Sequence, residues 1–163
     1  MQARVAELGR EITGDYDGLE PVLVGSLKAS LVFLSDLSRA VPIPHWLDFL
    51  ELAGYGPEPD LGGRPSIRLL KDLDVDVEGR HVLIVEDVID TGLTLNYLVR
   101  SLELRRPQSV TAVTLLDRPY RRLVADLPVR YVGFTVPDEL FVGYGFDLEE
   151  RYRNLPDIRV VKD

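Results

Sequence analysis

The sequence predicts an α/β fold in which a central, mostly parallel, twisted sheet is flanked by helices. Two strand-turn-helix units carry this prediction. Residues 22–24 and 82–85 are short continuous runs of Val, Leu and Ile, and each run is followed by a turn and a segment with helical spacing of apolar residues. Such runs are typical of strands buried on both faces of a parallel sheet. Ligands of open α/β sheets bind where these strands end.

The remaining elements follow in order along the chain. Val5, Leu8 and Ile12 predict a short amphipathic helix over about 4–14, and a second helix is expected to begin at Leu27 and to stop before Pro42. Further strands are expected at 44–52, 67–70, 109–116 and 129–134. Residues 54–65 contain seven Gly or Pro among twelve, so a mobile loop is predicted there.

Composition limits the function classes. A chain of 163 residues is expected to form a single domain, here 1–163, and the absence of cysteine excludes disulfides and thiolate chemistry. No apolar run is as long as a membrane span, so we expect a cytoplasmic protein with no membrane association. The net charge of −8 argues against a nucleic-acid partner. An anionic ligand would have to be held locally, by backbone amides, a cation and a few basic side chains.

The richest stretch is the end of the central run and the turn that follows it. Two adjacent carboxylates, Glu86 and Asp87, come directly after the strand. The turn from Asp90 to Thr94 then leads into a helix, whose unpaired N–H groups and the hydroxyls of its threonines can hold a phosphate. Because carboxylates repel phosphate, Glu86 and Asp87 must face hydroxyls or a divalent cation. A sugar phosphate meets both demands, whereas simple helix capping by Asp or Thr is the structural alternative.

Residues 85–94, VEDVIDTGLT, resemble the phosphoribosyl-pyrophosphate signature of the type I phosphoribosyltransferases and are most similar to its hypoxanthine-guanine branch. The resemblance implies the fold of that family, with a flexible active-site loop and a small base-binding hood, here about 136–163. It implies that Asp90, Thr91, Gly92, Leu93 and Thr94 bind the 5′-phosphate. Glu86 and Asp87 would hold the ribose hydroxyls and the region of a Mg²⁺ ion, and Asp90 would accept the purine N7 proton as the catalytic base.

Other segments resemble the pyrophosphate and lid segments of the same family. Leu27, Lys28 and Ala29 match the pyrophosphate-binding turn, with Ala29 in place of the family's glycine. Arg153 stands where the family has an arginine that contacts pyrophosphate. Tyr55 matches the tyrosine of the lid loop, with Gly54 in place of its serine.

The base-binding segments match the family only in part. Arg118 replaces the lysine that recognises the exocyclic oxygen of the purine, and these two cations differ in shape. In the segment containing Leu140, Phe141 and Val142, the usual stacking position falls on Leu140, so either Leu140 packs on the base or the segment shifts. Asp147 matches the aspartate that holds the metal through water. Arg121 and Arg122 are expected to be solvated, and each residue considered singly is also compatible with a structural role.

The resemblance therefore implies a purine phosphoribosyltransferase that joins hypoxanthine or guanine to 5-phosphoribosyl 1-pyrophosphate, with Mg²⁺ as cofactor, in purine salvage. It also implies a homodimer or homotetramer. Two alternatives stay open: a related enzyme acting on another base, and a non-catalytic protein that senses the sugar pyrophosphate or a nucleotide.

Overall fold

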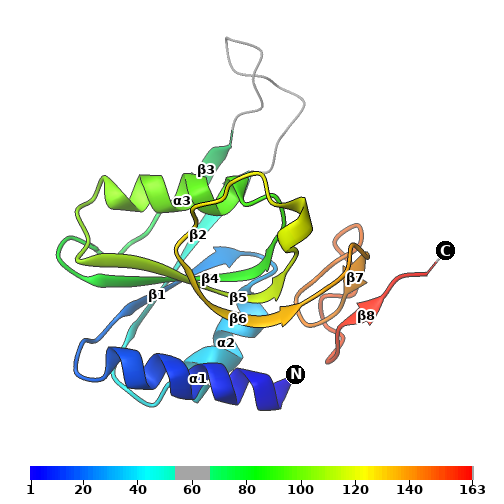
Figure 1. The fold of residues 1–163 in the computed structure, drawn as a ribbon, viewed down its shortest axis with the longest axis horizontal. Coiled ribbons are helices and arrows are strands. Elements are labelled where there is room, and N and C mark those ends of the chain that lie inside the picture. Colours follow the sequence, from blue (N-terminus) through cyan, green and yellow to red (C-terminus); the bar gives the residue numbers. More distant parts are fainter. Residues whose placement is uncertain (54–66, 163) are drawn as a thin grey trace, which may run out of the picture.

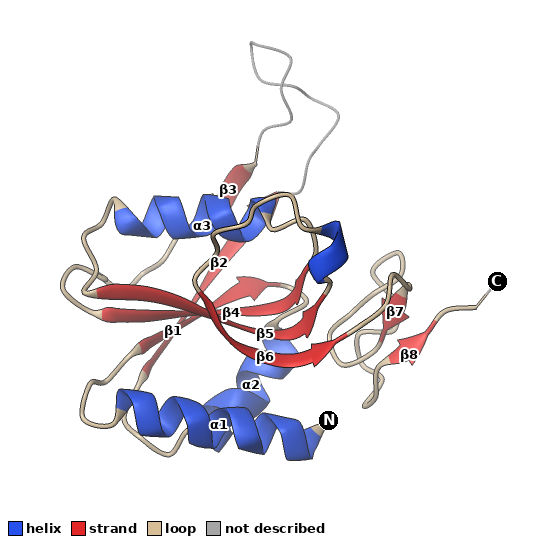
Figure 2. Cartoon of the chain, in the orientation of Figure 1, coloured by secondary structure: helices blue, strands red, loops and turns tan. Residues whose placement is uncertain are grey.

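The computed structural model describes residues 1–53 and 67–162, and these form a six-stranded sheet flanked by helices (Figures 1 and 2). The strands lie in the order β3-β2-β1-β4-β5-β6. All neighbouring pairs are parallel except β2 and β3. The bounds are β1 (Val22–Leu27), β2 (Trp46–Ala53), β3 (Arg68–Lys71), β4 (His81–Ile89), β5 (Ser109–Asp117) and β6 (Val129–Thr135). The predicted α/β class is confirmed.

Helices cover both faces of the sheet (Figure 2). α1 (Gln2–Tyr16) and α2 (Leu31–Ala40) pack on one face, and α3 (Leu93–Glu103) packs on the other. Each face has its own apolar core, the first centred on Leu8, Phe33 and Leu83 and the second on Ile84 and Leu98. No helix in the described ranges is both long and apolar enough to cross a membrane. The central strand is therefore buried from both sides, as its continuous apolar run indicates.

The C-terminal residues 136–162, called the hood below, follow β6 and carry a small antiparallel pair, β7 (Phe141–Val142) and β8 (Arg159–Val160). The hood lies beyond one end of the large sheet in Figure 1. A 3₁₀ turn, η1 (Pro119–Arg121), follows β5 near the same end. The predicted loop at 54–65, including Tyr55, lies outside the described residues.

Two predicted boundaries are wrong. The second helix begins at Leu31, because β1 continues to Leu27 in parallel pairing with β2. The central strand does not end at Val85, because its pairing with β5 continues to Ile89 opposite Asp117. Glu86 and Asp87 therefore lie inside β4. Backbone pairing with neighbouring strands, which a single run of residues does not reveal, extends both strands past their apolar stretches.

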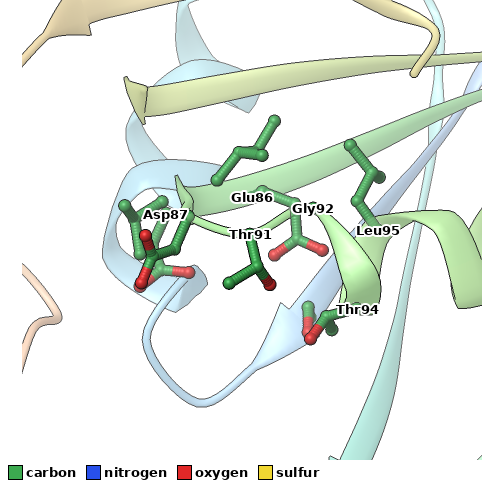
Figure 3. Close-up of a pocket in the computed structure, with 10 residues that line it drawn as sticks. Glu86, Asp87, Thr91, Gly92, Thr94 and Leu95 are labelled. Carbon is green, nitrogen blue, oxygen red and sulfur yellow. The ribbon is translucent and has the colours of Figure 1, made fainter. Parts of the chain in front are cut away.

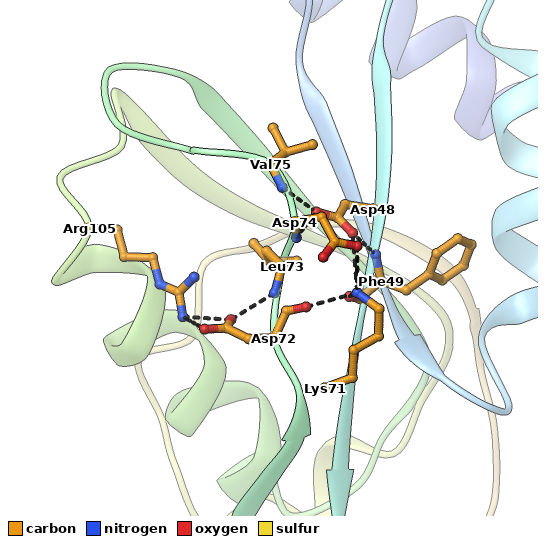
Figure 4. A network of polar contacts seen from close by, with 8 residues as sticks. All are labelled: Asp48, Phe49, Lys71, Asp72, Leu73, Asp74, Val75 and Arg105. Atoms are coloured by element: carbon orange, nitrogen blue, oxygen red, sulfur yellow. Dashed lines mark hydrogen bonds and ion pairs between the residues drawn. The ribbon is translucent and has the colours of Figure 1, made fainter.

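A buried carboxylate, Asp48, ties β2 to the segment that follows β3 (Figure 4). It accepts hydrogen bonds from the backbone N–H groups of Phe49, Asp74 and Val75 at 2.7, 2.7 and 2.8 Å. The Lys71 ammonium lies 3.7 Å from the same carboxylate. Burial opposes ionisation of Asp48, but these donors outweigh it and lower its pKa below the ordinary value of 3.8. The ionised carboxylate thus replaces the backbone partners that this irregular segment lacks.

Asp48→Asn is expected to lower the free energy of unfolding by about 1–3 kcal/mol at neutral pH, because buried N–H groups lose an acceptor. The folded-state pKa lies below the unfolded one. The stabilisation is therefore complete above the unfolded pKa and disappears as the pH falls through the folded pKa. Urea unfolding at neutral and acidic pH measures both effects. Asp74→Asn, whose carboxylate is exposed, is the control; equal losses in the two variants would contradict this role for Asp48.

Candidate functional site

A cavity of about 270 Å³ lies where β4 ends and α3 begins (Figure 3). It is lined by Ser26, Glu86, Asp87, Val88, Ile89, Asp90, Thr91, Gly92, Thr94 and Leu95. Six of the residues predicted for the sugar phosphate are among them, while Leu93 lies in the same turn but does not line the cavity. Ser26 comes from β1, so the ends of two neighbouring parallel strands meet here, as expected for a ligand site of an α/β sheet.

Gly92 is the residue that lets the turn close. It is the N-cap of α3 and has a left-handed backbone, with φ 83°, which favours glycine. A Cβ at this position would lie 2.7 Å from Leu127 Cδ1. No side chain caps the helix at Gly92, and Thr91 Oγ1 accepts only a long bond of 3.4 Å from Leu93 N. Side-chain capping of the helix is therefore not the role of this turn. The amides and hydroxyls of the turn stand at the N-terminus of α3, beside the cavity.

Glu86 and Asp87 are carboxylates held away from water. Glu86 is only 5% exposed, and its Oε1 has no hydrogen-bond partner among the described residues. Burial, and then the neighbouring charge of Asp87, raise the pKa of Glu86 well above its ordinary value. Burial raises the pKa of Asp87 to about 6, with Asp147 adding to the rise and Arg153 opposing it. Two such acids facing one cavity are suited to hydroxyl donors or to a cation.

The described residues contain no group of three or more His, Asp or Glu side chains arranged to hold a metal by themselves. The donor set nevertheless fits Mg²⁺, which binds one or two carboxylates together with substrate phosphates rather than an all-protein cage. Glu86 supplies a buried oxygen without a partner, and Asp147 lies close enough to Asp87 to affect its pKa. Glu86, Asp87 and Asp147 would thus share the cation with oxygens of the ligand.

Asp90 is held by arginines from the segment after β5. Arg121 Nε lies 3.0 Å from Asp90 Oδ1, and Arg118 Nη1 lies 3.9 Å from Oδ2. Arg121 also pairs with Asp138 of the hood at 2.9 Å. Arg122 donates to the Asp90 backbone carbonyl at 3.3 Å. This cluster therefore joins the central turn to the hood.

The prediction that Arg121 and Arg122 are solvated holds for Arg121, which is exposed, and is wrong for Arg122, whose side chain is only 18% exposed. Arg121 bridges two carboxylates, and the Arg122 side chain is mostly buried against Asp117. Sequence reasoning missed both residues, because their acidic partners come from other segments of the chain. One signal was available: three arginines lie within five positions after the end of β5, at the ligand edge of the sheet.

In the base-binding segment, Phe141 and Leu140 differ in exposure. Phe141 is 8% exposed, and its ring lies 5.3 Å from the guanidinium carbon of Arg118. Leu140 is 50% exposed, and Val142 is buried. Arg118 donates to the backbone carbonyl of Glu139. The Phe141 ring is thus occupied in packing, and Leu140 is the free side chain at the stacking position.

Two of the residues predicted for pyrophosphate, Lys28 and Arg153, are brought together by a shared partner, Glu150. Arg153 Nη1 donates to the Gly145 carbonyl at 2.9 Å, and Arg153 Nη2 pairs with Asp147 at 2.9 Å and Glu150 at 3.3 Å. Glu150 also pairs with Lys28 at 3.1 Å. The Leu27–Lys28 peptide bond is cis. Ala29 is not among the residues with positive φ, so its methyl group is compatible with the turn.

The hood touches this turn through Gly145. Its φ is 101°, and a Cβ there would lie 2.1 Å from the Ala29 carbonyl oxygen. Gly145→Ala is therefore expected to lower the free energy of unfolding by about 1–3 kcal/mol and to weaken anion binding at Lys28. Gly14→Ala is the control, because a Cβ at that helical glycine meets nothing within 4 Å; it should stabilise by about 0.5–1 kcal/mol. Thermal unfolding measures both, and a neutral Gly145→Ala variant would contradict the close approach.

Comparison with known proteins agrees with this geometry. The family model of the phosphoribosyl transferase domain matches residues 1–147. The hypoxanthine phosphoribosyltransferase of Salmonella typhimurium is 50% identical over 158 residues, which cover 96% of this chain and 87% of that protein. The hypoxanthine-guanine phosphoribosyltransferase of Bacillus subtilis is 46% identical over 162 residues, with 99% and 88% covered.

Solved structures show the same fold. A hypoxanthine-guanine phosphoribosyltransferase from Bacillus anthracis, with HEPES in its active site, matches with a TM-score of 0.91 at 44% identity over 99% of this chain and 93% of that one. The hypoxanthine phosphoribosyltransferase of Trypanosoma cruzi, in complex with its product IMP, gives a TM-score of 0.89 at 37% identity, with 99% and 89% covered. With matches of this identity over nearly its whole length, the chain belongs to the hypoxanthine-guanine phosphoribosyltransferase family.

Proposed function

We propose that this protein is a purine phosphoribosyltransferase of purine salvage, joining hypoxanthine or guanine to 5-phosphoribosyl 1-pyrophosphate and releasing pyrophosphate. The observation that carries the proposal is the cavity at the end of β4, where buried acids stand beside a helix N-terminus lined with hydroxyls. A sugar phosphate needs both chemistries at once. The membership of the chain in the family supports the same reaction.

The 5′-phosphate is proposed to bind the turn from Asp90 to Thr94, with the amides at the start of α3 as donors. Glu86 and Asp87 would accept hydrogen bonds from the ribose hydroxyls. Burial raises their pKa values, and hydroxyl donors or a cation would favour the ionised form again by supplying the polar contacts that burial removes. The cavity is small enough that the ribose and its phosphate would fill much of it.

In the transfer step, N9 of the purine forms a bond to C1 of the ribose while the bond from C1 to the pyrophosphate oxygen breaks. The proton on N7 of the base passes to the Asp90 carboxylate. Lys28 and Arg153 stabilise the charge that develops on the departing pyrophosphate. Bound Mg²⁺ would add charge neutralisation at the same oxygens, with Glu86, Asp87 and Asp147 as its nearest protein ligands.

The base pocket is proposed to be formed by Arg118, Leu140, Phe141 and Val142. The Arg118 guanidinium lies between Asp90 and the hood, which suits a donor to the exocyclic oxygen of a 6-oxopurine. Leu140 would cover the face of the base in place of an aromatic ring. Tyr55 would close over the site as part of the lid. A homodimer or homotetramer is also proposed, and light scattering on the purified protein tests it.

The experiment that tests the proposal is pyrophosphate release from 5-phosphoribosyl 1-pyrophosphate and Mg²⁺ with a panel of hypoxanthine, guanine, xanthine, adenine and uracil. Release with the 6-oxopurines alone is expected, because Arg118 offers a donor where adenine carries one of its own. Release with another base only would replace the purine assignment. No release with any base, together with tight binding of the sugar pyrophosphate, would favour a non-catalytic sensor.

A further inference from the structure

One carboxylate, Glu150, lies between the two cations assigned to pyrophosphate. Its Oε2 lies 3.1 Å from Lys28 Nζ, and its Oε1 lies 3.3 Å from Arg153 Nη2. The two cations come from opposite parts of the chain, one after β1 and the other in the hood. A single glutamate therefore bridges them in the way that a bound anion would.

The position of Glu150 is fixed by the backbone, not by packing of its side chain. Its N–H donates to Asp147 Oδ2 at 2.9 Å, and its φ is 63°. The side chain itself is 65% exposed, and that of Lys28 is 58% exposed. Hydrogen bonding to Lys28, and then the charges of Lys28 and Arg153, lower the pKa of Glu150, so it is ionised at neutral pH. The Glu150 carboxylate thus places a negative charge beside the two cations. Because its side chain is exposed to water, it can move away from them.

We infer that Glu150 lowers the affinity of this site for pyrophosphate, because its carboxylate pairs with Lys28 and Arg153 and must be displaced before a phosphate anion can take its place. The inference rests on the proposed function only in assigning these two cations to pyrophosphate. Pyrophosphate has more charge and more acceptor oxygens than one carboxylate, so it displaces Glu150.

The contact also explains how a chain with net charge −8 keeps the exposed Lys28 and the mostly buried Arg153 ready for a polyanion. Before an anion binds, the carboxylate holds Lys28 and Arg153 near one another. These side chains therefore lose less conformational freedom when the anion binds. The same carboxylate also competes with the anion for these two cations. Each exposed ion pair is weak, so the net effect on affinity is expected to be modest.

The test compares two neighbouring glutamates. Glu150→Gln removes one carboxylate from both cations and leaves Arg153 paired with Asp147, whereas Glu149→Gln removes the same charge from a residue whose partner, within the described ranges, is Arg151. Isothermal titration with pyrophosphate and Mg²⁺ measures affinity directly, without any base. Glu150→Gln should bind pyrophosphate about three- to tenfold more tightly, as expected for losing two weak competing pairs. Glu149→Gln should stay within about twofold of the unaltered protein.

A second variant locates the effect. Lys28→Met in the Glu150→Gln background should remove most of the gain, because the gain depends on freeing Lys28. Equal affinities for Glu150→Gln and Glu149→Gln would overturn the inference. Weaker binding by Glu150→Gln would also overturn it, since Glu150 would then help to hold the ligand or its Mg²⁺.

The result is separable from the fate of the proposed function. Tighter pyrophosphate binding by Glu150→Gln without turnover of any base would keep the role of Glu150 and reject the transfer reaction. Turnover of a base with unchanged pyrophosphate binding would keep the transfer reaction and reject the role of Glu150.

Discussion

Asp90→Asn is expected to lower kcat by about two to four orders of magnitude, the usual contribution of a general base. The asparagine keeps the shape of the side chain but accepts no proton from N7 of the base. Binding of the nucleotide product should survive, because the turn amides and Gly92 are unchanged. Steady-state turnover and product titration measure the two quantities separately.

Asp126→Asn is the control for this variant, since Asp126 is exposed and lies in the loop between β5 and β6. It should change kcat by less than about twofold, as surface substitutions usually have small effects. Unchanged turnover in Asp90→Asn would remove Asp90 from the role of base. Loss of nucleotide binding together with turnover would instead show that the pairing of Asp90 with Arg121 holds the turn in place.

Arg153→Met is expected to lower kcat/KM by about two to three orders of magnitude, the cost of removing one donor to a developing negative charge. Arg153 is mostly buried, and its guanidinium is oriented by the Gly145 carbonyl and by Asp147. It therefore requires little rearrangement when pyrophosphate departs. Initial rates at varied concentrations of the sugar pyrophosphate measure the loss.

Arg151→Met is the matched control, two residues away and, in the part of the chain that the structure describes, paired with the exposed Glu149 alone. It should leave kcat/KM within about threefold, as expected for a solvated ion pair. Arg153→Lys should recover part of the activity if charge alone matters, but little if the two-nitrogen contact with Gly145 and Asp147 matters. Equal losses in Arg151→Met and Arg153→Met would show that only general positive charge is needed.

Much of this site could be predicted because its chemistry is local in the sequence. Glu86, Asp87, Asp90 and Gly92 fall within one strand-turn-helix unit, so the order of residues already places them at one edge of the sheet. The apolar runs on either side predict buried parallel strands, and the strand order confirms them. Local pattern is enough where neighbours in the chain are neighbours in space.

The parts that could not be predicted depend on contacts across the chain. The partners of Arg121 are Asp90 and Asp138, 31 and 17 positions away, and nothing in the local pattern around Arg121 indicates either one. Glu150 meets Lys28 across 122 positions. The burial of Phe141 beneath Arg118 likewise depends on how the hood folds back. Such pairings are set by tertiary packing and not by periodicity.

The most direct test of the account is to identify the products formed from hypoxanthine, 5-phosphoribosyl 1-pyrophosphate and Mg²⁺ by chromatography and mass spectrometry. Inosine 5′-monophosphate and pyrophosphate are expected in equal amounts, with the nucleotide lost in Asp90→Asn. Pyrophosphate formed without nucleotide would mean that water, not a purine, attacks the ribose. Absence of both products, with the sugar pyrophosphate still bound, would contradict the assignment of this site to phosphoribosyl transfer.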